Sequence, residues 1–127
     1  MISPNEFVSC RNGEYDKAIA DYKQALAINP DSAKVYNALA WLYATCPDKK
    51  YRDGKKAVDS ASKACHLTEG TAWPCLDTLA AAYAESGDFE KAKQWEAKAI
   101  EMAPDAKECR SRMELYKQGK PYREESK

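Results

Sequence analysis

The sequence predicts an all-α fold, and three observations support this prediction. First, residues 36–44 and 76–84 can be laid over each other: each has an apolar residue, Leu three places on, a small residue next, and Tyr three places later. Second, a shorter alanine pattern recurs at residues 18–25, 57–64 and 92–99. Third, capping residues, glycines and prolines punctuate the chain at helical intervals. Because an internal repeat of this kind dictates the architecture, the fold class follows from it.

Capping residues and helix breakers divide the chain into expected helices. Ser and Asp side chains cap a helix start by accepting backbone N–H groups, while Gly and Pro end helices. In chain order, the expected starts are at Ser3, Tyr15, Ser32, Asp53, Pro74, Asp88 and Asp105. The matching ends are at about Asn12, Ile28, Thr45, Leu67, Gly87, Met102 and Gln118. Ser3 with Glu6, and Asp105 with Glu108, also fit the capping-box pattern.

The composition is typical of a soluble globular domain and favours no charged partner. Hydrophobic residues make up 44% of the 127 positions and charged residues 31%, which is too apolar for disorder. Twenty basic residues offset twenty acidic ones, so neither nucleic acid nor an anionic membrane is an expected partner. The local basic run at residues 49–56 contains one aromatic residue, Tyr51, and we interpret it as a solvated loop. Without a signal peptide or a long apolar run, we expect a cytoplasmic protein.

The cysteines and the single histidine do not predict an active site. The five cysteines are widely spaced and odd in number, so we expect reduced thiols that pack as small apolar residues. The best catalytic arrangement is Cys65 and His66 with Glu69, but adjacent helical residues point about 100° apart. For the same reason a metal site is not expected, because His66 is the only histidine. The sequence therefore predicts no enzyme, no metal and no cofactor.

The repeat resembles the tetratricopeptide repeat, whose 34-residue unit is two antiparallel helices with small and apolar residues at fixed places. Pro30 and Pro104 close the first and third alanine patterns as that repeat requires. Residues 40–58, 76–84 and 115–123 also resemble the C-terminal repeats of bacterial, planctomycete-like tetratricopeptide proteins. The resemblance implies a right-handed superhelix of antiparallel helix pairs, with about three repeats and a C-terminal capping helix. It implies a protein-interaction scaffold and carries no catalytic activity.

The spacing predicts one domain, residues 1–127, with unequal repeats. Tyr43 and Tyr83 are 40 residues apart, more than one period, so the middle of the chain carries insertions. The expected units are a shortened repeat at about 1–30, a repeat at about 32–68 with a loop insertion at 46–52, a repeat at about 73–104, a capping helix at about 105–118, and a tail at 119–127.

In this family the first helix of each pair lines a concave face, and a protein or peptide partner is expected there. By register, the residues expected on that face are Lys34, Asn37, Trp41, Thr45, Asp77, Ala81 and Glu85. An exposed Trp41 would anchor the partner, and Asn37 would bond its backbone. The other interpretation is that Trp41 packs against a neighbouring helix and Asn37 is solvated. Related co-chaperones grip a carboxylate with charged and amide residues. The matching places here carry Ser3 and Phe7, then Ala38, then Pro74 and Thr78, so a carboxylate clamp of that type is not expected.

Two further expectations concern the ends of the repeat array. Because the first helix is short, the apolar face of Ala18, Ile19, Tyr22 and Leu26 is expected to be poorly covered and prone to self-association. The alternative to a partner-binding module is a structural one, in which the chain is the capped C-terminal end of a longer array with no ligand of its own. A buried Trp41 and a closed groove would favour that alternative.

Overall fold

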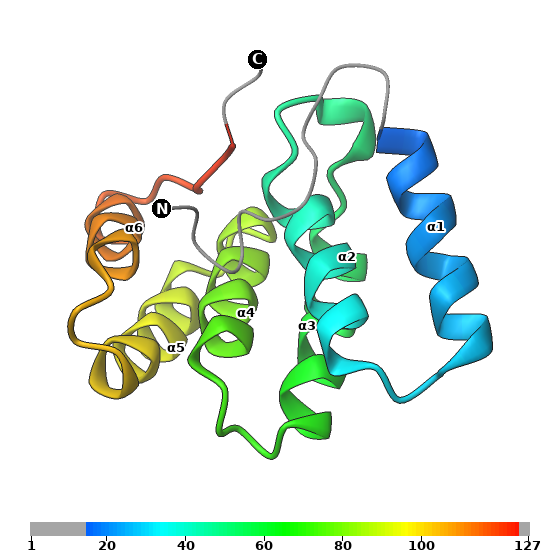
Figure 1. The fold of residues 1–127 in the computed structure, drawn as a ribbon. Coiled ribbons are helices and arrows are strands. Elements are labelled where there is room, and N and C mark those ends of the chain that lie inside the picture. Colours follow the sequence, from blue (N-terminus) through cyan, green and yellow to red (C-terminus); the bar gives the residue numbers. More distant parts are fainter. Residues whose placement is uncertain (1–14, 125–127) are drawn as a thin grey trace.

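The computed structural model describes residues 15–124, which form an all-α array of antiparallel helices (Figure 1). The helices are α1 (Tyr15–Ile28), α2 (Ala33–Thr45), α3 (Gly54–Leu67), α4 (Trp73–Glu85), α5 (Phe89–Met102) and α6 (Lys107–Lys117), with a short 3-10 helix, η2 (Lys49–Tyr51). The closest pairs are α2 with α3 and α4 with α5, while α4 also packs on α2 and α3. Helix α1 covers α2 at one end, and α6 covers α5 at the other. None of the helices in this range is both long and apolar enough to cross a membrane.

Most predicted helix boundaries agree with the structure. The side chains of Ser32, Asp53 and Asp88 each accept the backbone N–H three residues on, as a helix cap does. The prediction for the last helix is wrong at its start, because α6 begins after Ala106, which makes no side-chain cap, and not after Asp105. The helix expected between Ser3 and Asn12 lies outside the described residues.

The segment between α2 and α3, expected as a solvated loop, is folded back onto the helices. The guanidinium of Arg52 donates to the carbonyl oxygen of Cys46 at 2.8 Å. The ring centroid of Tyr51 lies 5.2 Å from that of Tyr15, and the Tyr51 hydroxyl donates to Asp16 at 2.9 Å. These contacts join η2 to α1, so the segment helps to hold α1 against the rest of the array.

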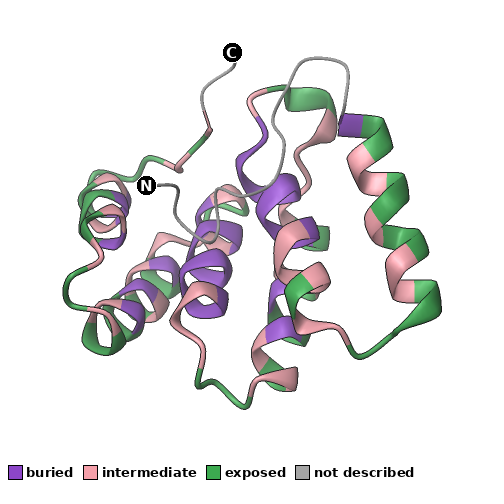
Figure 2. Cartoon of the chain, viewed as in Figure 1, coloured by how far each residue is buried: buried purple, intermediate pink, exposed green. Residues whose placement is uncertain are grey.

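Alanines make the close helix–helix contacts possible. Ala40, Ala57, Ala80 and Ala92 are completely buried, as their place in the repeat predicts. Buried residues concentrate on α2 and α4, the central helices of the array (Figure 2). Larger side chains at these positions would push paired helices apart, since protein interiors are close-packed.

A second close approach was not evident from the repeat. Gly54, the first residue of α3, lies against Ser86, the residue that follows α4. A Cβ at position 54 would stand 2.5 Å from the Ser86 hydroxyl oxygen and 3.0 Å from its Cα. Glycine is therefore required for packing at this point, where the insertion returns the chain to the next helix.

Candidate concave-face binding site

The expectation that Trp41 is exposed is wrong. Its side chain on α2 is 0% exposed, and residues that follow α6 contact it. The indole N–H of Trp41 donates to a carboxylate oxygen of Glu124 at 2.8 Å. The Tyr122 ring lies 5.7 Å from the indole, centroid to centroid. Trp41 is thus already in contact with a polypeptide segment, one supplied by its own chain.

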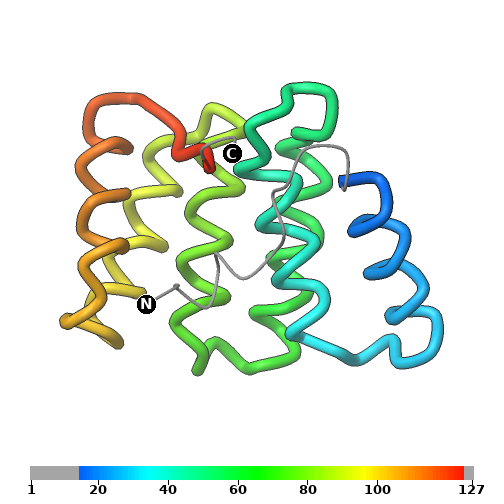
Figure 3. The backbone as a smooth tube through the Cα atoms, turned by 45° about the horizontal axis from the view of Figure 1, so that its top comes forward, coloured from blue at the N-terminus to red at the C-terminus, as the bar shows by residue number. Residues whose placement is uncertain are grey.

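We call this segment, residues 119–124, the strap. It begins at Gly119, whose φ of 72° is in the left-handed region that favours glycine and ends α6. The strap then runs from α6 across α4 toward the C-terminal end of α2 (Figure 3). There the backbone N–H of Glu124 donates to the carbonyl oxygen of Thr45 at 2.7 Å. One residue earlier in the strap, the guanidinium of Arg123 donates to the carboxylate of Glu85 on α4 at 3.1 Å.

Three further residues predicted to project from the concave face are also buried. Thr45 is buried, and its hydroxyl donates to the Trp41 carbonyl oxygen at 2.7 Å within α2. Ala81 is buried on α4. Asp77 is buried in an ion pair. The helical register gave no sign that these three residues would be buried in the folded array.

The remaining predicted residues lie toward the edges of this face. Lys34 is exposed and Asn37 is half-buried, both in the first half of α2. Glu85 is half-buried at the end of α4, where Arg123 of the strap and Arg52 contact its two carboxylate oxygens. The structure therefore brings Trp41, Thr45 and Glu85 together around the strap, whereas Lys34 and Asn37 lie farther along α2.

Arg112 is the residue at the centre of the site that sequence reasoning did not select. It projects from α6, is 1% exposed, and donates to Asp77 on α4 at 2.7 Å. Its guanidinium carbon lies 4.7 Å from the Trp41 ring centroid and 4.6 Å from that of Tyr122. Burial lowers the pKa of Arg112, but Asp77 and Tyr122 outweigh this effect, so the pKa is raised and the group stays charged. The signal was present as an arginine on the apolar side of the capping helix.

Below this ion pair lies a second buried carboxyl group, Glu96 of α5. Burial, together with the neighbouring Asp77, raises the pKa of Glu96 from 4.5 to about 11, so it is neutral at pH 7. Burial also raises the pKa of the Cys109 thiol and of the Tyr116 hydroxyl. One guanidinium thus compensates one carboxylate, and the second carboxyl keeps its proton.

This cluster does not fit a metal ion, although its atoms are close together. Side-chain donor atoms of Asp77, Glu96 and Cys109 lie within 4.8 Å of one another. However, Arg112 already bonds to Asp77, and both Glu96 and Cys109 favour their protonated forms. A cation would have to displace a guanidinium and two protons, so the chemistry of the site opposes it.

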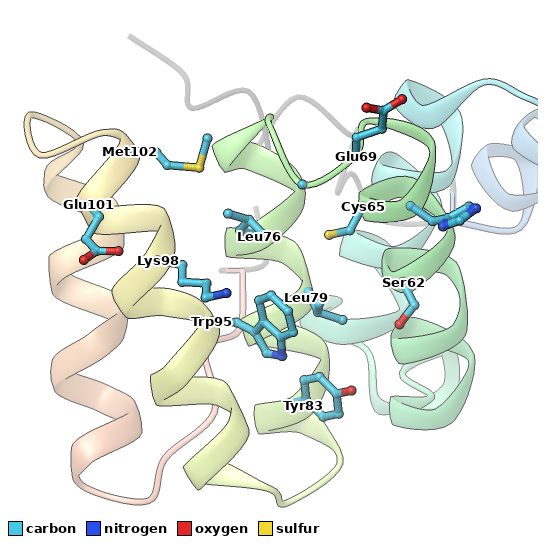
Figure 4. A pocket seen from close by; sticks show the side chains of 12 residues that line it. Ser62, Cys65, Glu69, Leu76, Leu79, Tyr83, Trp95, Lys98, Glu101 and Met102 are labelled. Carbon is cyan, nitrogen blue, oxygen red and sulfur yellow. The ribbon is translucent and has the colours of Figure 1, made fainter.

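A separate groove of about 800 Å³ lies on the opposite side of α4, between α3 and α5. Leu76, Leu79 and Tyr83 of α4 form its floor, and Trp95 of α5 forms one wall (Figure 4). These α4 positions point away from Asp77, Ala81 and Glu85, as the helical period requires. The groove is therefore a different surface from the concave site.

The cysteine and histidine that the sequence analysis considered for catalysis both line this groove. Cys65, His66 and Glu69 all contribute to the α3 side. The thiol of Cys65 is hydrogen-bonded to that of Cys75, which, together with burial, raises the pKa of Cys65. A raised thiol pKa opposes the thiolate that a nucleophile needs. The four cysteines among the described residues are free, and three of them are buried, as expected for small apolar residues.

Comparison with known proteins agrees with this architecture. A family model described as TPR repeat matches residues 9–45. A second, described as tetratricopeptide repeat, matches residues 75–106. No curated protein sequence matches the chain. Repeats of this type generally mediate protein–protein interactions, and the family is typically a non-enzymatic scaffold. From the two matches and the paired helices, the chain belongs to the tetratricopeptide-repeat family.

Proposed function

We propose that this chain is a protein-interaction module that binds an extended segment of a partner on the concave face of α2, α4 and α6. One observation carries the proposal: the strap lies on this face and is held by a main-chain hydrogen bond to Thr45 and by side-chain contacts to Trp41 and Glu85. A surface that holds one polypeptide segment in this way supplies the donors, acceptors and ring faces that another segment needs.

The partner's course along the face follows from the helical period. Lys34 and Asn37 precede Trp41 on the same side of α2, so a segment longer than the strap would run past them. The central contacts would be with Trp41 and Arg112, because tryptophan and arginine at the middle of an interface contribute most to binding. The partner would replace the strap, since the two cannot occupy the face together.

A structural role is the second candidate, and the burial of Trp41 favours it. In that case the strap and α6 close the concave face permanently, and the chain is the capped end of a longer repeat array. Self-association through α1 belongs with this candidate. Ile19, Tyr22 and Leu26 pack on the core but stay partly exposed, and Ile28 is 80% exposed. Sedimentation as a monomer at high concentration would argue against such self-association.

The two candidates differ in what happens when the strap is released. We define the strap variant as the full chain with Tyr122→Ala, Arg123→Ala and Glu124→Ala. A control variant carries three exposed substitutions on α1, Asp21→Ala, Lys23→Ala and Gln24→Ala. In pull-downs from the source cell, a partner enriched by the strap variant over both wild type and control supports the interaction module. A partner captured equally by all three excludes the concave face, and none at all favours the structural role.

A further inference from the structure

Building on the proposed function, we propose that the concave face recognises an aromatic, a basic and an acidic residue in succession, and that the strap is a built-in competitor for that motif. The strap presents these residues as Tyr122, Arg123 and Glu124. Tyr122 contacts Arg112 and Trp41, Arg123 contacts Glu85, and Glu124 accepts from the Trp41 indole, so the face contains three adjacent subsites. The partner this surface fits is therefore an unfolded or loop segment of another protein that carries the same chemistry.

The aromatic subsite is built from a fixed cation and a buried ring. The guanidinium of Arg112 lies 4.6 Å from the Tyr122 ring centroid and is held in place by Asp77. The indole of Trp41 lies 5.7 Å from the same ring, centroid to centroid, with the two ring planes tilted by 37°. A cation near a ring and a tilted ring pair both favour an aromatic residue over an aliphatic one.

The basic subsite is the carboxylate of Glu85 on α4. Its side chain is only 15% exposed, and its two oxygens contact Arg123 at 3.1 Å and Arg52 at 3.6 Å. Arg52 comes from the segment between α2 and α3, so the subsite depends on that insertion. The Glu85 carboxylate contacts two cations, so it favours a basic residue and repels an acidic one at this position of the bound segment.

The acidic subsite is the indole N–H of Trp41 beside the end of α2. Glu124 accepts this hydrogen bond at 2.8 Å, and its own backbone N–H donates to Thr45. A buried N–H needs an acceptor, and a carboxylate is the strongest one that a peptide offers. In an extended segment alternate side chains point the same way, which explains why positions 122 and 124 both face Trp41 while position 123 faces Glu85.

The strap competes because it is tethered to α6 through Gly119. A short tether keeps a segment at an effective concentration of about 1 mM, so an external segment with the same contacts binds poorly until the strap is released. Anything that removes the strap would therefore expose the motif-binding subsites. The strap thus sets the affinity threshold for a partner.

Binding of a peptide in trans tests this inference. A fluorescent peptide with the sequence of residues 118–127 is titrated into the full-length strap variant and into wild type, with anisotropy as the readout. We expect saturable binding to the strap variant and binding to wild type at least ~10-fold weaker, because the tethered strap competes. Peptides with Tyr122→Ala, Arg123→Glu or Glu124→Gln should each bind more weakly, and a scrambled peptide should not bind.

A double-mutant cycle assigns the acidic subsite specifically. In the strap variant carrying Trp41→Phe, the peptide change Glu124→Gln should have no further effect, since the indole donor is gone. Circular dichroism checks folding, and Arg123→Ala alone serves as the strap-releasing variant if the triple substitution unfolds the chain. Equal binding of the peptide to wild type and strap variant, or of the scrambled peptide, would overturn the inference. A wild-type dimer lost in the strap variant would also overturn it and indicate strap exchange between two copies. If the peptide does not bind, the pull-down still tests the proposed function separately, because it can capture a partner whose bound segment has a different sequence.

Discussion

Trp41 on α2 donates its indole N–H to the carboxylate of Glu124 in the strap, at 2.8 Å and across 83 positions of sequence. This bond joins the middle of the array to a segment that follows its last helix. Together with Arg112, which contacts the rings of both Trp41 and Tyr122, it makes the centre of the concave face a closed, charged and aromatic cluster. The following predictions test the energetics of that cluster and of the packing around it.

The burial of Trp41 predicts that substitutions there act on stability as well as on binding. Trp41→Ala should destabilise the fold by about 3–5 kcal/mol, because it removes a completely buried aromatic side chain. Trp41→Phe should cost less, since it mainly removes the hydrogen bond to Glu124. Urea denaturation of the two variants measures the difference. A Trp41→Ala variant as stable as wild type would contradict the buried position.

The ion pair between Asp77 and Arg112 predicts a large coupling between these two positions. Arg112→Met should destabilise by about 3–5 kcal/mol, because it leaves a buried carboxylate without its cation. Adding Asp77→Leu should restore much of that stability. Urea denaturation of the single and double variants gives the coupling energy. Strictly additive effects would show that the pair does not interact as described.

The neutral carboxyl of Glu96 predicts a stability that falls as the pH rises. Its pKa is raised from 4.5 to about 11 in the folded state, so between these values the folded chain binds one proton more than the unfolded chain. The stabilisation is complete below the unfolded pKa and decreases with rising pH by up to about 1.4 kcal/mol per unit. Glu96→Gln should flatten this dependence between pH 6 and 8 in urea denaturation. If the free energy of unfolding depended on pH equally in wild type and in Glu96→Gln, this would contradict a buried, protonated Glu96.

The close approach at Gly54 predicts that even alanine is too large there. Gly54→Ala should destabilise by about 1–3 kcal/mol, because the added methyl meets Ser86 at 2.5 Å. Part of the loss should be recovered by Ser86→Ala, which removes the hydroxyl oxygen but leaves the neighbouring backbone. Thermal denaturation of the single and double variants checks this. A neutral or stabilising Gly54→Ala would show that the two helix ends are not in contact.

The helices could be predicted from the sequence because their signals are local. The caps at Ser32, Asp53 and Asp88 depend on residues three positions apart, and the alanine pattern depends on one helical face. The prediction of a cap at Asp105 was wrong, because the capping-box pattern alone does not determine which residue ends the loop before α6. Likewise, the Gly54–Ser86 contact joins the start of α3 to the end of α4, and no local pattern encodes their proximity.

The concave site was predicted only in part, for a physical reason. Helical register assigns Trp41, Asp77 and Glu85 to one side of their helices. In the structure, Trp41 and Glu85 contact the strap, and Asp77 pairs with Arg112 of α6. Whether that side faces solvent depends on α6 and the strap, and these meet it only in the folded array. Arg112 lies on the apolar side of the capping helix, but no local pattern identifies its buried partner, Asp77, which is 35 positions away.

Hydrogen exchange of the Trp41 indole N–H, followed by NMR, tests the central claim most directly. Trp73 and Trp95 provide internal references, and Trp41→Phe assigns the resonance. If the strap occupies the concave face, this N–H exchanges slowly in wild type and at least ~10-fold faster in the strap variant, while the two reference indoles are unchanged. Equal exchange of the Trp41 indole in both proteins would contradict the strap's place on the concave face, and with it the binding site proposed for this repeat protein.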